Sequence, residues 1–195
     1  MNNYRRFLES QGYNVSPQWP VLENRVECRI FEKGSLIVDD TKPSFCIYLL
    51  DIGCVRFFTE IDDVEFTNEF IEAPNAFGTH LGFDPQEYNL VNIQALTDVE
   101  IYVLEPEGLE IMINKYPGFK EIGDQTVGQL LKKRNAYAKM LAHNTPEERY
   151  KHFMNTQASL LQIVPQHMIA SYLGITPESL SRIRKRMFSR PDKLK

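Results

Sequence analysis

Two short helical segments near the C-terminus, separated by a glycine, restrict the fold more than any other part of the sequence. Pro165 is expected to begin the first segment, PQHMIASYL, and Gly174 follows it where a left-handed residue commonly ends a helix. Thr176 and Pro177 are residue types favoured at the cap and at the first position of a helix. The sequence therefore predicts a helix, a tight turn and a second helix.

The second segment has an apolar side and a polar side. At about 100° per residue, Leu180, Ile183 and Met187 fall together and can pack on the first segment. A polar helix face is usually only a solvated surface, but this one combines groups that can pair with base edges: Arg with guanine, Glu with cytosine, Ser with a base or phosphate. The polar face carries Glu178, Ser181, Arg182 and Lys185. Residues placed to pass the sugar-phosphate backbone are Arg184, Lys185, Arg186 and Arg190.

Charge is distributed unevenly along the chain. The formal net charge is -4, but residues 1–142 carry -9 and residues 143–195 carry +5. A basic terminal segment of this size is expected of a protein that contacts phosphates, although solvated lysines alone would also produce it. The two parts of the chain are therefore expected to meet different partners.

The middle of the chain has the pattern of a β-structure. Between Val26 and Leu104, short runs rich in Ile, Val, Phe and Tyr alternate with Gly, Pro, Asn and Asp, which predicts strands joined by turns. Many short strands in succession favour a barrel or sandwich over parallel strand-helix-strand units. One short helix is predicted from Glu107 to Asn114. The runs are CRIF, SLIVDD, FCIYLLDIG, CVRFFTEI, EFTNEFI, LVNIQAL and VEIYVL.

A long helical segment begins at Phe119. Its apolar positions are spaced three, four, three and four residues apart, which is the pattern of a coiled-coil seam. We interpret it as a self-association seam, and the alternative is an amphipathic helix that lies on its own barrel. The residues Thr145, Pro146 and Glu148 then form a capping-box pattern, so a boundary is predicted near His143. The seam residues are Val127, Leu130, Arg134, Tyr137 and Leu141.

The C-terminal segments resemble those of a known regulator family. The string IASYLGITPESLSRIRK is similar to the helix-turn-helix of the Crp/Fnr superfamily (cyclic-AMP receptor protein and fumarate-nitrate regulator), in which an LG turn precedes a recognition helix of the form E-x-x-S/G-R. Glu178, Ser181 and Arg182 fall on those three positions, whereas Pro177 departs from the family's frequent Arg or Val. The resemblance implies DNA contacts by Thr176, Glu178, Ser181, Arg182, Lys185 and Arg186.

The resemblance covers nearly the whole chain and implies an α+β fold. It implies an N-terminal antiparallel β-roll of the cyclic-nucleotide-binding jelly-roll type over residues 1–118, a long dimerisation helix over 119–143, and a C-terminal winged helix-turn-helix over 144–195. Such a protein is expected to be a cytoplasmic homodimer that regulates transcription from a palindromic site on double-stranded DNA, with RNA polymerase as a further partner.

A candidate effector pocket also follows from the resemblance. FEKGSLI and IYLLDIGCVRFF resemble the family's glycine turns, and IEAPNAFGTHLG, which contains Gly78, resembles the entrance to its phosphate-binding cassette. Thr79 stands where a Glu would hold the ribose, Asn89 where an Arg would clamp the phosphate, and Leu90 where a hydroxyl residue is expected. A charged hydrogen bond of that kind contributes about 1.5 to 3 kcal/mol, so we expect cyclic AMP to bind poorly. Arg134 completes the pocket, where it either pairs with an acidic side chain or contacts an anionic effector of unknown identity.

Other kinds of site have little support in the sequence. The three cysteines lack C-x-x-C spacing and are predicted to be small buried hydrophobic residues, and the first of them, Cys28, comes too late for an N-terminal iron-sulfur cluster. His80 is the one haem-ligand candidate in the roll and is expected to be a structural residue. No metal, cofactor or catalytic motif is predicted, so the chain is not expected to be an enzyme.

No apolar run approaches the roughly 20 residues of a membrane-spanning helix, so no membrane partner is expected.

One alternative function stays open at this point. The charge of -9 on residues 1–142 would repel phosphates, which favours a ligand-binding or protein-interaction module that has lost DNA binding. Steep salt dependence of DNA binding would instead favour a regulator.

Overall fold

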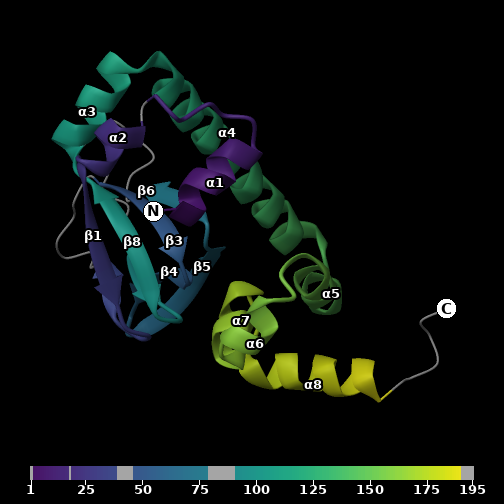
Figure 1. Ribbon diagram of the computed structural model, residues 1–195. Helices are drawn as coiled ribbons and strands as arrows, with labels where there is room; N and C mark the ends of the chain where they lie inside the picture. Colours follow the sequence, from purple (N-terminus) through teal and green to yellow (C-terminus); the bar gives the residue numbers. More distant parts are fainter. Residues whose placement is uncertain (1, 18, 39–45, 79–90, 190–195) are drawn as a thin grey trace. The chain divides into compact units, whose positions relative to one another are not determined.

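The computed structural model describes residues 2–17, 19–38, 46–78 and 91–189 (Figure 1). Its contacts divide the chain into two units. One unit consists of Met1–Thr59 with Glu69–Leu131, and the other of Glu60–Asn68 with Lys132–Lys195. The division falls inside the long helix rather than at its ends, so the domain boundaries expected from the sequence stay a prediction.

The first unit is built on two antiparallel sheets. One has the strand order β1-β8-β3-β6 and the other the order β2-β7-β4-β5. In the second sheet, the register places Phe57 of β4 opposite Ile93 of β7. This architecture confirms the predicted α+β fold with an antiparallel β-roll. The strands are β1 (Val26–Phe31), β2 (Leu36–Val38), β3 (Ile47–Ile52), β4 (Cys54–Ile61), β5 (Val64–Glu72), β6 (Asn75–Gly78), β7 (Asn92–Ala95) and β8 (Val99–Leu104).

Apolar side chains fill the core of the roll. Leu50, Val55, Ile93 and Ile101 are completely inaccessible to solvent. An aromatic cluster adds to them: the rings of Tyr48 and Phe77 stack with centroids 5.3 Å apart, and Phe57 meets Phe77 edge-on at 5.2 Å. Burial of this apolar surface is the main force that holds the two sheets together.

The cysteine prediction is correct for two residues and wrong for the third. Cys46 and Cys54 are buried, whereas Cys28 is exposed. Cys28 lies on β1, which is the edge strand of its sheet, opposite Tyr102 of β8. Its side chain therefore lies on the outer surface of the roll.

Gly53 forms the turn between β3 and β4. Its φ is +96°, a region that L side chains rarely adopt, and an added Cβ would lie 2.4 Å from the carbonyl oxygen of Asp98. This turn lies within the run IYLLDIGCVRFF that the sequence singled out.

Two N-terminal helices, which the sequence did not predict, cover part of the roll. α1 (Asn2–Ser10) lies against β3, and the Asp51 carboxylate accepts a hydrogen bond from the Tyr4 backbone N–H at 2.7 Å (Figure 1). α2 (Trp19–Glu23) buries Trp19. The predicted helix at Glu107 is present as α3 (Pro106–Lys115), and its Met112 is buried in the same apolar cluster.

The second unit is mainly helical. The predicted capping box at Thr145 is present, with the Thr145 side chain and backbone both bonded to Glu148. Tyr150, Phe153 and Leu173 are buried in its core. The described residues after His143 contain helices and no strand, so the wing expected from the resemblance is not found among them. Residues 190–195 lie outside the described part of the chain. The helices are α4 (Pro117–His143), which begins in the first unit, α5 (Pro146–Thr156), α6 (Leu160–Ile163), α7 (Gln166–Tyr172) and α8 (Pro177–Phe188).

The tip of the β4–β5 hairpin belongs to this second unit. Asp62 and Asp63 form its turn with positive φ angles of 51° and 60°. The Ser171 hydroxyl of α7 accepts a hydrogen bond from the Thr67 backbone N–H at 2.9 Å and donates to the Glu65 carbonyl at 3.2 Å. Because β5 is an edge strand, this hydroxyl occupies backbone groups that a neighbouring strand would otherwise use.

Candidate nucleic-acid interface

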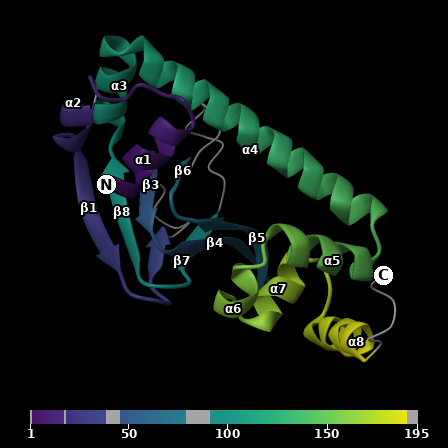
Figure 2. The same cartoon turned by 45° about the vertical axis from the view of Figure 1, so that its right-hand side comes forward.

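α7, a tight turn and α8 form the scaffold of the interface (Figures 1 and 2). Gly174 ends the first helix with a φ of +63°, and Ile175 N–H bonds back to the Ala170 carbonyl at 3.0 Å. Arg149 of α5 reinforces the turn, because its guanidinium donates to the Leu173 carbonyl at 2.7 Å. The predicted helix, turn and helix are therefore confirmed, with the turn tied to a third helix.

The cap of α8 has the predicted residues in the predicted positions. Thr176 is the N-cap and its side chain accepts a hydrogen bond from the Ser179 backbone N–H at 3.2 Å. Pro177 follows at the first helical turn. Leu180 and Ile183 are buried, so the opposite side of the helix faces solvent.

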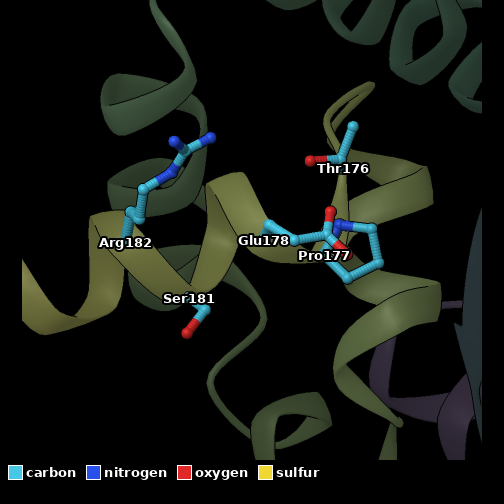
Figure 3. A pocket seen from close by; sticks show the side chains of 5 residues that line it. All are labelled: Thr176, Pro177, Glu178, Ser181 and Arg182. Atoms are coloured by element: carbon cyan, nitrogen blue, oxygen red, sulfur yellow. The ribbon is translucent and has the colours of Figure 1, made fainter.

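The exposed side of α8 brings the predicted recognition residues together. A shallow hollow at its N-terminal end is lined by Thr176, Pro177, Glu178, Ser181 and Arg182 (Figure 3). In that view the Ser181 hydroxyl and the Arg182 guanidinium point to opposite sides of the ribbon. A donor, an acceptor and a hydroxyl thus project from little more than one turn of one helix.

The electrostatic state of this face suits hydrogen bonding to bases. Hydrogen bonds with its own backbone N–H and with the Thr176 side chain lower the pKa of the Glu178 carboxyl below its usual value. Glu178 is therefore ionised at neutral pH and can only accept hydrogen bonds. The Arg182 guanidinium donates to the Ser179 hydroxyl at 3.3 Å, which leaves most of its donors available.

A second hollow continues along α8 and contains residues that the sequence analysis missed. Gln166, Ser181, Arg184, Lys185 and Ser189 line it. Gln166 is the first residue of α7, so the start of the first helix lies beside the polar face of the second. The sequence could have indicated Gln166 as part of the interface, because this residue lies at the start of the predicted first helix.

Arg186, a predicted DNA contact, is ion-paired in this structure. Its guanidinium bonds to the Glu147 carboxylate of α5, and Lys151 bonds to the other oxygen of Glu147 at 3.0 Å. These two hydrogen bonds, that of Lys151 first, lower the pKa of the Glu147 carboxyl. Arg186 would therefore use the same guanidinium to contact DNA and to pair with Glu147.

The comparisons with known proteins found similar solved structures but no match by sequence. No protein-family model matches the chain, and no curated protein matches its sequence. Among solved structures, a CooA mutant from Carboxydothermus hydrogenoformans matches with a TM-score of 0.72 at 22% identity, over 96% of this chain and 84% of that one. FixK2 from Bradyrhizobium japonicum matches with a TM-score of 0.72 at 17% identity, over 84% and 85% of the two chains.

A third structure names the family. A protein from Eubacterium rectale assigned to the Crp/Fnr family of transcriptional regulators matches with a TM-score of 0.70 at 14% identity, over 92% of this chain and 85% of that one. The chain has the fold of the Crp/Fnr regulators. This agreement extends over both sheets and the C-terminal helices, since the matches cover most of each chain.

The dimer seam predicted for this Crp/Fnr fold lies along α4. Val127 is 42% exposed and the neighbouring Leu131 50%, which leaves apolar surface uncovered within the single chain. Tyr137 is used differently: its hydroxyl donates to the Tyr172 carbonyl at 2.6 Å and its ring stacks on that of Tyr172. Leu130 and Leu141 are half-buried. Pairing of two α4 helices stays a prediction.

The effector pocket predicted for the Crp/Fnr fold is described only in part. Gly78 ends β6 opposite Ile47. Thr79, Asn89 and Leu90, together with His80, lie outside the described residues. Arg134 is exposed, and in the described part of the chain no carboxylate forms an ion pair with it. An acidic partner for Arg134 and its contact with an anionic effector both stay predictions.

The described residues lack two further kinds of feature. No cluster of three or more His, Cys, Asp or Glu side chains that could hold a metal ion occurs among them. Among the same residues, no helix combines the length and the apolar character needed to cross a membrane.

Proposed function

We propose that the protein is a sequence-specific DNA-binding transcription regulator that acts as a homodimer on a palindromic site. One observation carries the proposal: Glu178, Ser181 and Arg182 lie together on the solvent side of α8, whose other side is buried on its scaffold. The structural neighbours include CooA, which is described as a CO-dependent transcription factor, and a regulator assigned to the Crp/Fnr family. A shared fold and an exposed reading face together favour regulation over catalysis.

In this proposal α8 enters the major groove. Two copies of a helix-turn-helix in a symmetric dimer read half-sites about 34 Å apart, one turn of the duplex. Arg182 bonds to the O6 and N7 atoms of a guanine, and Glu178 accepts from a cytosine amino group, so each half-site contains a G·C pair. The resemblance to the Crp/Fnr family favours a TGA-like core. Thr176, Lys185 and Arg186 contact the backbone.

Dimerisation through α4 supplies the symmetry that the palindrome requires. The exposed Val127 and Leu131 offer apolar surface for a second copy of the helix, and association of apolar surfaces is favourable in water. Each subunit then presents one copy of α8. RNA polymerase is the partner through which a regulator bound in this way would act.

The direct test is selection of DNA sites from random oligonucleotides by the full chain. We expect an enriched palindrome whose half-site centres are about 10 base pairs apart. Affinity for it should fall steeply between about 50 and 200 mM salt, because phosphate contacts release counterions. Failure to enrich any sequence, together with salt-independent capture of another ligand or protein, would support the interaction module instead.

The same selection tests the effector expectation. Because Thr79 and Asn89 replace the cassette's Glu and Arg, we expect cyclic AMP at micromolar concentrations to leave DNA affinity unchanged. Tighter DNA binding in the presence of cyclic AMP would contradict our interpretation of those two positions.

A further inference from the structure

Glu147 joins two helices of the second unit through an ion pair. Its carboxylate lies on the first turn of α5 and bonds to Arg186 in the last turn of α8, 39 residues along the chain. Arg186 follows Arg182 by one helical turn, so it lies directly beside the face that we propose reads bases. The partner of Arg186 in the free protein is therefore an anion at the edge of the proposed DNA surface.

The pair is accessible and can be exchanged. The Arg186 side chain is 55% exposed and the Glu147 side chain 32%. Ion pairs in this setting are weak because water screens them, whereas hydrogen bonds from Arg to phosphate are bidentate and strong. A phosphate oxygen near Arg186 would therefore be the better acceptor.

Lys151 keeps the free-energy cost of this exchange low for the Glu147 carboxylate. It bonds to Oε1 of Glu147, while Arg186 bonds to Oε2. When Arg186 moves to another acceptor, Glu147 keeps a cationic partner one turn away on the same helix. Neither charge is left isolated by the change.

The ion pair is not needed to hold α8 in place. Leu180 and Ile183 anchor that helix in the core, and α7 packs against it. Burial of two such side chains outweighs a surface ion pair. The Glu147–Arg186 pair can therefore break while α8 stays in place.

We infer that Glu147 is an internal competitor of DNA, a carboxylate that holds Arg186 in the free protein and releases it to a backbone phosphate on binding. Glu147 then lowers affinity for all DNA sequences by a common factor without contributing to base recognition. This inference rests on the proposed function.

The test compares Glu147→Gln with the parent chain on the selected palindrome and on an unrelated duplex. We expect affinity for both to rise by the same factor, about 2- to 5-fold, since the surface pair is no longer broken on binding. In an Arg186→Gln background the same substitution should change affinity by less than about 1.5-fold. Glu9→Gln is the matched control, because it breaks a Glu–Arg pair with Arg5 in the first unit, which does not contain α8, and removes the same charge.

Three results would overturn the inference and leave the proposed function in place. Lower affinity of Glu147→Gln, with an unchanged melting temperature, would mean that the pair is required in the complex. An equal gain with and without Arg186 would mean simple repulsion between Glu147 and phosphate. A parent chain that binds no DNA would reject the proposed function itself, whereas a parent that binds and a variant that gains nothing would reject only the role of Glu147.

Discussion

Arg182 is the side chain whose loss should change which sequence is recognised. Its guanidinium is exposed on α8 and bonds only to the Ser179 hydroxyl among the contacts described for it. We expect Arg182→Ala to cost about 1 to 3 kcal/mol on the selected site and to relax preference at one base pair. Lys185→Ala is the control, and it should weaken binding to all sequences alike, as measured by mobility shift. Full selectivity of the Arg182 variant would contradict the assignment.

Arg149 should matter for stability rather than for recognition. It donates a charged hydrogen bond to the Leu173 carbonyl at the end of α7, in a partly buried position. Arg149→Met should lower the free energy of unfolding by about 1.5 to 3 kcal/mol, measured by urea denaturation. The exposed Lys151→Met should change it by less than about 0.5 kcal/mol. Equal effects of the two substitutions would show that the bond to Leu173 contributes little.

Sequence reasoning at this scale succeeded where the signal was local. Leu180 and Ile183 are buried and Ser181 is exposed because helical periodicity alone decides which side of α8 packs. Arg186 was assigned to DNA with no sign of its pairing with Glu147, because that contact joins residues far apart in the sequence. Cys28 was misassigned because residue type alone does not tell an edge strand from a central one.

Among the elements, the turn between β3 and β4 depends on Gly53. Any Cβ at this position meets the Asp98 carbonyl oxygen and requires an unfavourable φ. We expect Gly53→Ala to destabilise the roll by at least about 1 to 3 kcal/mol. Gly123→Ala on α4, where a Cβ meets no atom within 4 Å, should be neutral or slightly stabilising. Thermal unfolding of both variants measures the difference, and similar melting temperatures would contradict it.

The strands were predictable and the N-terminal helices were not. Alternating apolar runs lie close to the observed strands, and CVRFFTEI coincides with β4. α1, in contrast, has a polar sequence, and its Tyr4 is fixed by the carboxylate of Asp51, a partner 47 residues away. β6 was also missed, since its four residues were interpreted only as the entrance to the cassette. Short elements that depend on distant partners leave little trace in a single sequence.

For the molecule as a whole, self-association through α4 is the property to test. Val127→Glu places a charge on exposed apolar surface in both copies of a symmetric seam. We expect the dimer dissociation constant to rise at least about tenfold in analytical ultracentrifugation, because two apolar contacts are lost. Gln129→Glu adds the same charge at a polar, exposed position of the same helix and should have little effect. A parent that sediments as a monomer would exclude the seam.

The whole-molecule expectations came from resemblance more than from periodicity. The sequence contains both sheets and the C-terminal helices in recognisable form, so the Crp/Fnr fold could be predicted. The association of the hairpin tip with the C-terminal helices could not, because it depends on one hydroxyl of Ser171 and two backbone groups of β5. Backbone hydrogen bonds carry no side-chain signature that a sequence pattern can display.

That hydroxyl has a practical consequence for dissecting the protein. The second unit is assembled from two separate stretches of chain, since Glu60–Asn68 belongs to it together with Lys132–Lys195. A fragment that starts at Asn144 would leave Ser171 with no backbone edge to bind and would expose the surface that the hairpin covers. Truncation would thus alter the very part it was meant to isolate, and single substitutions in the intact polypeptide are the sounder way to separate the contributions of roll and helices.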